Sequence, residues 1–259
     1  MRYTGWLNVR KVKAIQTRIS IIVPTYEEEA YIENTLSSLE RAVNSAEHRY
    51  VESEVIVVDA GTDNTYEKAK RFTENVYKTD HDGVSRARNL GASKANGNIL
   101  VFVDADTIVP LNILSELEKT FAHKDVVASV GYVLPDGNND LSVSERLFFK
   151  LDSFFIRRIV KFSKIFLKFY TRGDMLAVRE KTFREVGGFD LKLNCMEITE
   201  LLARLSKRGK IEVLDVPIYE SGRRIRRYGL ARNYMIWGRN FVSFNLLKKP
   251  FSSTWEPVR

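Results

Sequence analysis

Ile99-Leu-Val-Phe-Val-Asp-Ala-Asp106 is the stretch that decides the fold of this 259-residue chain. Five consecutive apolar residues are typical of a parallel strand that is buried on both faces. The run ends in two carboxylates that are separated by one small residue. Because residues two apart in extended backbone point to the same side, Asp104 and Asp106 can face one hard cation. We expect Mg²⁺ or Mn²⁺ there; the alternative is a solvated turn.

Two earlier predicted strands also end in polar residues. Arg18 to Val23 is stopped by Pro24-Thr-Tyr-Glu27, and Glu54-Val-Ile-Val-Val-Asp59 runs into a Gly-Thr-Asp turn. Helical patterns separate the strands, which predicts an α/β fold with a mostly parallel sheet flanked by helices. Ligands in such sheets lie at the carboxyl ends of the strands, so the three strand ends predict one site. Asp59 suits either a base N–H or a local Asx turn, and these two roles are compatible.

The composition fits a globular protein with a basic surface. Apolar residues make up 44% of the chain, the formal net charge is +8, and Cys195 is the single cysteine. A basic surface attracts nucleic acid, anionic lipid or phosphate-bearing ligands, and charge alone does not choose among them. No long uncharged apolar run is present, so we expect no membrane-spanning helix and no secretory signal.

Two segments combine basic and aromatic residues. Residues 141–170 hold seven basic and two acidic residues among many Phe, Leu and Ile, and residues 221–249 hold eight basic residues and no acidic one. The first segment is interpreted either as an amphipathic helix at a membrane interface or as a helix packed on the sheet. The second could close over a diphosphate, bind lipid head groups or contact another subunit. We do not expect nucleic acid as a partner.

Six segments, in this order along the chain, resemble family 2 glycosyltransferases with the GT-A fold. They are Ile21-Ile-Val-Pro-Thr-Tyr-Glu-Glu-Glu-Ala-Tyr-Ile32, Val57-Val-Asp-Ala-Gly-Thr-Asp-Asn-Thr65, Ser85-Arg-Ala-Arg-Asn-Leu-Gly-Ala92, Phe102-Val-Asp-Ala-Asp-Thr107, Gly187-Gly-Phe-Asp190 and Glu197-Ile-Thr-Glu-Leu-Leu-Ala-Arg-Leu205. The resemblance implies an inverting, metal-dependent transfer from a nucleoside-diphosphate sugar. It further implies that the metal segment is Asp104 and Asp106.

The resemblance also implies positions for the other site residues. The residues expected to border the nucleotide are Pro24, Tyr26, Glu28, Asp59, Arg88 and Asp104. The residues expected to border the donor sugar and the acceptor are Gly173, Asp174, Gly188, Phe189 and Asp190.

One position departs from the family pattern. The family usually has Glu-Asp where this chain has Glu197-Ile198, and the Asp is the usual general base. Ile198 cannot accept a proton. Glu197 is the expected replacement, with Glu200 next; a helix-start carboxylate is the structural alternative for Glu197. An acceptor that is already an anion, such as a lipid phosphate, needs no base.

These patterns predict a GT-A domain at residues 15–220 and a basic aromatic C-terminal arm at residues 221–259. The expected acceptor is lipid-linked or a saccharide. We expect a cytoplasmic location, with peripheral attachment to an anionic membrane surface as an open option. The rival functions are a nucleotidyltransferase and a non-enzymatic module that binds anionic membranes. The nucleotidyltransferase would call for a Gly-rich basic loop after the first strand, where this chain has Pro24-Thr-Tyr-Glu27.

Overall fold

A single mixed sheet forms the centre of the molecule in the computed structural model. The model describes residues 17–45, 51–136, 142–162, 174–247 and 249–252. The sheet has the order β3-β2-β1-β4-β7-β6-β8-β5. Its strands are β1 (Thr17–Thr25), β2 (Val51–Asp59), β3 (Val76–Lys78), β4 (Ile99–Val103), β5 (Thr107–Ile108), β6 (Val126–Pro135), β7 (Met175–Arg179) and β8 (Lys210–Glu220).

The parallel half of the sheet contains the three strands that the sequence predicts to share one edge. β1 pairs in parallel with both β2 and β4, and Thr25 at the end of β1 is in register with Asp59 at the end of β2. β7 is antiparallel to β4 and β6, while β6 and β8 are parallel. The expected mostly parallel sheet is therefore confirmed, and the loops after β1, β2 and β4 leave the same edge.

Helices cover both faces because alternate residues of the buried strands point to opposite sides. One core cluster joins Ile21 and Val57 of the sheet to α1 (Ile32–Val43) and α4 (Ile113–Ala122). The other joins Ile22 and Val58 to α3 (Val84–Lys94), α6 (Glu180–Glu185) and α7 (Glu197–Leu205). The short helix α2 (Thr65–Ala69) follows β2.

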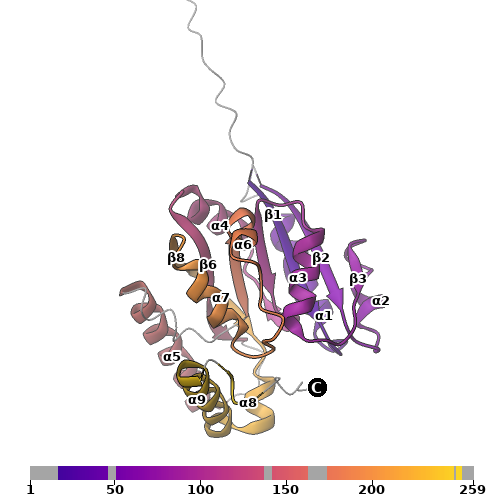
Figure 1. Cartoon of the computed structure of the whole chain (residues 1–259). Coiled ribbons are helices and arrows are strands. Elements are labelled where there is room, and N and C mark those ends of the chain that lie inside the picture. Colours follow the sequence, from indigo (N-terminus) through magenta and orange to yellow (C-terminus); the bar gives the residue numbers. More distant parts are fainter. Residues whose placement is uncertain (1–16, 46–50, 137–141, 163–173, 248, 253–259) are drawn as a thin grey trace, which may run out of the picture.

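The remaining helices gather at one end of the molecule (Figure 1). They are α5 (Val143–Phe162), α8 (Arg223–Tyr228) and α9 (Leu230–Leu247). The basic segment that begins at residue 221 thus forms the expected helical arm over its described part. Within the described residues, no helix has the length and apolar character needed to cross a bilayer.

Candidate functional site

A cavity of about 480 Å³ opens at the sheet edge where β1 and β4 end. Its wall includes the predicted residues Pro24, Tyr26, Glu28, Arg88, Asp104, Asp106, Asp174 and Glu197. The arm closes one side of the cavity with residues of α8 and α9. A space of this size suits a small organic ligand, and the carboxyl end of a parallel sheet is the usual place for one.

Two arginines hold the two aspartates that follow β4. Arg88 Nη2 lies 2.8 Å from Asp104 Oδ1, and Arg88 Nη1 lies 2.6 Å from Glu197 Oε1. Arg223 donates both Nη atoms to the Glu28 carboxylate at 2.7 Å, and its Nε lies 2.9 Å from Asp106 Oδ2. Each arginine therefore joins one aspartate of the pair to one glutamate from a distant part of the chain.

Negative charge is concentrated on this wall. Burial raises the pKa of Asp106 to about 7; Arg223 lowers it, and the nearby charges of Glu28, Asp104 and Asp174 raise it. Burial also raises the pKa of Glu28 against the effect of its Arg223 partner. Crowded carboxylates repel one another, and a divalent cation between them relieves the repulsion.

The donor set fits a hard cation that also takes ligands from a substrate. Asp104 and Asp106 both border the cavity and supply the carboxylate oxygens that Mg²⁺ and Mn²⁺ prefer. Among the described residues, no three His, Cys, Asp or Glu side chains form a ready metal cluster. One or two carboxylates completed by waters and substrate phosphates is the usual magnesium arrangement, so the residues fit that ion.

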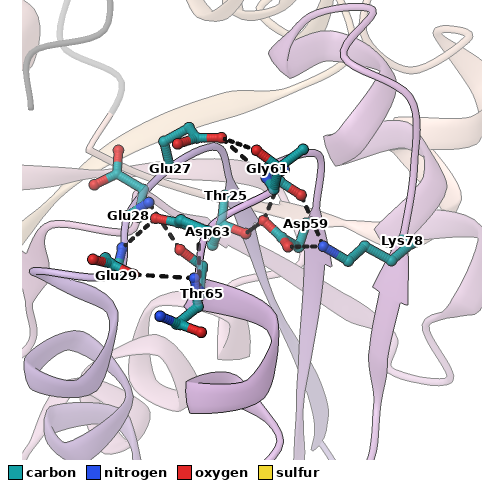
Figure 2. A network of polar contacts seen from close by, with 11 residues as sticks. Thr25, Glu27, Glu28, Glu29, Asp59, Gly61, Asp63, Thr65 and Lys78 are labelled. Atoms are coloured by element: carbon teal, nitrogen blue, oxygen red, sulfur yellow. Dashed lines mark hydrogen bonds and ion pairs between the residues drawn. The ribbon is translucent and has the colours of Figure 1, made fainter.

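The loops after β1 and β2 are held together by a polar network (Figure 2). Glu27 adopts a left-handed φ of 57°, and its carboxylate accepts hydrogen bonds from the backbone and hydroxyl of Thr62. The Glu28 N–H donates to the Thr65 hydroxyl at 2.9 Å. A Cβ at Gly61 would lie 2.8 Å from the Glu27 nitrogen, so the close approach of the two loops requires glycine there. This network fixes the part of the wall that carries Glu28.

Asp59 belongs to the same network and does not border the cavity. Its Oδ1 accepts hydrogen bonds from the Thr25 hydroxyl and the Gly61 N–H, and its Oδ2 accepts one from Lys78 Nζ at 2.7 Å. The side chain is fully buried. The geometry corresponds to the local turn role that the sequence left open for this residue, and the base-binding role stays a prediction.

A flat aromatic surface lies beside the network. The rings of Tyr26 and His81 stack with centroids 3.7 Å apart and planes 16° from parallel. Both residues border the cavity next to Pro24. Flat rings at a cavity wall offer a stacking surface to a nucleobase. The sequence pointed to Tyr26 but not to His81, whose loop position before α3 gives no motif.

The start of α7 places its two glutamates differently. Glu197 borders the cavity and is buried, with its Oε1 held by Arg88. Ile198, at the usual position of the base, is 3% exposed and packs in the core. Glu200 lies away from the cavity, where both of its oxygens accept from Arg204 of the next turn. Of the two expected carboxylates, the structure brings only Glu197 to the site.

Three residues expected near the sugar lie elsewhere. Phe189 is buried among Phe102 and Phe183, and its backbone is held by the Asn89 side chain. Gly188 precedes it with φ 69°, and Asp190 is exposed. The Arg88 guanidinium carbon lies 5.3 Å from the centroid of the Phe189 ring, so this segment contacts the Arg88 side chain and helps to hold it in place. Asp174 does border the cavity, and Gly173 lies outside the described residues.

Several residues on the wall have no counterpart in the motifs. They are His81, Asn194, Arg223, Arg224, Asn233 and Trp237. Arg223, Arg224, Asn233 and Trp237 come from the basic aromatic segment, so composition pointed to the segment but not to the individual side chains. The Asn194 side chain lies against Gly83, where φ is 96° and a Cβ would lie 1.8 Å from the Asn194 Oδ1, so this close approach requires glycine.

Proteins with related sequences and structures include glycosyltransferases. A dolichol-phosphate mannosyltransferase from Pyrococcus furiosus is 28% identical over 122 residues, which is 45% of this chain and 34% of that protein. The chain thus spans about a third of that relative's length.

Two solved structures share the fold. A mannosyltransferase from Pyrobaculum calidifontis, in complex with GDP-Man and Mn²⁺, has a TM-score of 0.62 at 21% identity. The match covers 87% of this chain and 65% of that mannosyltransferase chain. Glucosyl-3-phosphoglycerate synthase from Mycobacterium tuberculosis, in complex with Mg²⁺ and UDP, has a TM-score of 0.60 at 16% identity. The match covers 90% of this chain and 79% of that protein. Both confirm the GT-A type of fold.

The family model described as "Glycosyl transferase family 2" matches residues 20–187. That range contains the three strand ends, Arg88, both cavity aspartates and Asp174. More than half of the chain is matched, and five of the six segments that suggested the resemblance begin within the match. The chain therefore belongs to glycosyl transferase family 2.

Proposed function

We propose that this chain transfers a sugar from a nucleoside-diphosphate sugar to a lipid-linked or saccharide acceptor, with inversion at the anomeric carbon. The observation that carries the proposal is the cavity at the sheet edge, with Asp104 and Asp106 on one wall and the Tyr26–His81 stack in the same lining. A diphosphate needs the cation site, and a base needs the flat surface. The family match favours glycosyl transfer over nucleotidyl transfer.

Asp104 and Asp106 would hold Mg²⁺ or Mn²⁺, which when bound neutralises the charge of the diphosphate leaving group. Arg88 keeps the Asp104 carboxylate pointed into the cavity, because its other Nη is anchored on buried Glu197. Arg223 supplies positive charge beside Asp106 and Glu28, next to the place where the diphosphate would lie. Asp174 follows the same wall and would border the donor sugar.

Glu197 is the proposed base for a hydroxyl acceptor. Its Oε1 is held by Arg88, so Oε2 would take the proton as the acceptor oxygen attacks the anomeric carbon and the diphosphate leaves with the bonding electrons. A phosphate acceptor is the second candidate, favoured by the apolar, buried Ile198 at the usual base position. A phosphate oxygen is already an anion, so no proton moves and Glu197 serves only to hold Arg88.

Binding of nucleotides tests the donor part of the proposal. Thermal shift is measured with UDP, GDP and other nucleoside diphosphates, each with and without Mn²⁺. We expect one nucleotide to raise the melting temperature of the protein, and more so with the cation. Asp104→Ala should lose the cation-dependent part, while Asp190→Ala, an exposed aspartate outside the cavity, should keep it. A shift that is equal with EDTA and in both variants would refute the metal role.

Turnover with defined acceptors tests the acceptor part. With a hydroxyl acceptor, Glu197→Gln should lower kcat by about 10²–10⁴-fold, and Glu200→Gln should leave it near the wild-type value. With a phosphate acceptor, Glu197→Gln should change kcat much less. No sugar transfer with any nucleotide sugar that binds would refute the proposed activity.

A further inference from the structure

Exposed apolar side chains are concentrated on two helices. Among the described residues, 13 large apolar side chains are exposed, and 11 of them belong to α5 or to the segment that runs from α9 to Phe251. On α5 they are Val143, Leu147, Phe148, Leu151, Phe154 and Phe155. On α9 and after it they are Met235, Val242, Leu246, Leu247 and Phe251. The other two, Leu111 and Leu191, lie outside these segments.

The two helices form one surface. The rings of Phe148 on α5 and Tyr234 on α9 meet edge to face with centroids 4.9 Å apart. The helices also lie close together in the view of the whole chain (Figure 1). Contiguous apolar surface of this kind is uncommon on a protein that contacts only water, and it marks an interaction site.

The charge on this surface selects the partner. On the described part of this surface the exposed basic residues are Arg146, Lys150 and Arg158 of α5 and Arg232, Arg239 and Lys249 of the C-terminal segment, and that segment has no acidic residue between positions 221 and 249. Arg239 lies 3.9 Å from the centre of the Phe251 ring, and Arg158 lies 5.8 Å from the Phe154 ring. Arginine stems along apolar rings, with charged heads outward, match the boundary between lipid chains and anionic head groups. A second copy of this chain would bring the same positive charge to the contact.

The helix α9 contributes both to this surface and to the wall of the cavity. Asn233 and Trp237 of α9 border the cavity, while Met235 and Val242 on the same helix are exposed. One helix therefore separates the proposed donor site from the apolar surface. An acceptor carried by a lipid at this surface would be separated from the cavity only by the width of α9.

We propose that α5, α9 and residues 249–251 dock on an anionic lipid bilayer as one peripheral surface, and that this places the α9 wall of the cavity next to the head groups. With the surface docked, the bilayer would be the source of the acceptor in the proposed function. Only this statement about the acceptor rests on the proposed function. Binding to lipid depends on the surface and not on sugar transfer, so the two can fail separately.

Flotation of the full chain with vesicles tests the docking. The vesicles are phosphatidylcholine alone, or phosphatidylcholine mixed with phosphatidylglycerol. We expect binding to the mixed vesicles, weakened by salt, and little binding to phosphatidylcholine alone. The double variants Leu151→Ser/Phe155→Ser on α5 and Leu246→Ser/Leu247→Ser on α9 should each weaken binding by about tenfold or more.

Matched controls separate docking from a general loss of apolar surface. Leu111→Ser/Leu191→Ser removes two side chains outside both helices that are as exposed as Leu151 and Phe155, and this variant should bind as the wild type does. Nucleotide binding without vesicles should be unchanged in all three double variants, which shows that the fold and the donor site persist. The docking proposal is overturned if the wild type does not bind anionic vesicles. It is also overturned if the control variant loses as much vesicle binding as the two helix variants do. A concentration-dependent dimer that the helix variants dissolve would overturn it in favour of a contact between copies.

Discussion

Arg88 and Arg223 have the same task in two different regions of the molecule. Each joins one aspartate of the Asp104–Asp106 pair to one glutamate, at distances between 2.6 and 2.9 Å. Arg88 belongs to α3, which is packed on the sheet, and its side chain is 2% exposed. Arg223 begins α8 in the C-terminal arm, and its side chain is 10% exposed.

The surroundings of the two arginines differ more than their contacts. Arg88 is backed by the Phe189 ring, and its helix α3 packs in the core cluster on one face of the sheet. α8 has its own small apolar cluster, made of Ile225 with Leu230 packed against it. The ion pairs of Arg223, together with the hydrogen bond from the Ser221 N–H to the Asp106 carbonyl, tie the start of the arm to the sheet edge. Similar ion pairs thus serve as scaffold in one region and as an attachment in the other.

Removal of Arg88 should have the largest effect on stability. Arg88→Ala leaves the buried Glu197 and the half-buried Asp104 without their cation, and we expect a loss of about 3–5 kcal/mol in the free energy of unfolding. Urea denaturation of the purified variant measures this loss. Arg86→Ala is the control: Arg86 lies two residues earlier on the same helix, is half exposed, and pairs with exposed Asp82. We expect the control to change stability by less than about 0.5 kcal/mol. A loss below about 1 kcal/mol for Arg88→Ala would show that the ion pairs are solvated.

Asp106→Asn should change how stability depends on pH. The carboxyl has a folded pKa of about 7 against an ordinary value of 3.8, so between these pH values the folded state keeps a proton that the unfolded state has lost. Stability of the wild type should then fall as pH rises from about 4 to 7, by up to about 4 kcal/mol. Asparagine does not titrate, so the variant should lack the part of the fall that comes from Asp106, while Glu28, whose pKa burial also raises, still contributes.

Urea denaturation of both proteins across this pH range, with EDTA present to remove cations, checks the prediction. Asp190→Asn serves as a control because that aspartate is exposed. Parallel pH profiles for the wild type and Asp106→Asn would mean that Asp106 is ionised throughout the range.

Arg223→Ala should cost less than Arg88→Ala, because the Arg223 side chain is 10% exposed against 2% for Arg88, so water reaches Glu28 and Asp106 more easily once the arginine is removed. We expect a loss of about 1–3 kcal/mol. The variant should also have a higher Asp106 pKa, since Arg223 holds that pKa down. Proteolysis should become faster within residues 221–229, and Arg226→Ala, an exposed arginine of the same helix, should behave as the wild type. Equal proteolysis of both variants would show that other contacts hold the arm.

The contrast between the two arginines also explains what the sequence could predict. Apolar runs that end in Asp predicted the strand ends because a buried parallel strand leaves a local pattern. Arg88 was predicted to lie at the site because it belongs to a short segment, residues 85–92, that resembles a family motif. Arg223 reaches Glu28 across 195 positions, and no local pattern encodes that contact. The basic composition of residues 221–249 predicted an arm without saying which arginine enters the site.

Side-chain direction was the other limit of the sequence. Phe189 precedes residues of the site by a few positions in the sequence, but its ring packs against Phe102 and Phe183. Burial among aromatic rings stabilises this side chain more than exposure in a polar cavity would. Asp59 sits at the predicted strand end, yet Thr25, Gly61 and Lys78 take up its oxygens. The expected boundary between residues 15–220 and 221–259 stays a prediction, although β8 ends at Glu220.

Glu200→Ala should have the smallest effect and gives the comparison its lower limit. Glu200 and Arg204 form an i,i+4 pair on α7, with side chains 24–27% exposed. Solvent competes for such a pair, so we expect a loss of about 0.3–1 kcal/mol by urea denaturation. Arg204 also donates to the Val186 carbonyl at 2.5 Å and keeps that contact in the variant. If Glu200→Ala destabilised the protein as much as Arg223→Ala, partial exposure would not explain the different strengths of these ion pairs, and the ranking of Arg88 above Arg223 would lose its physical basis.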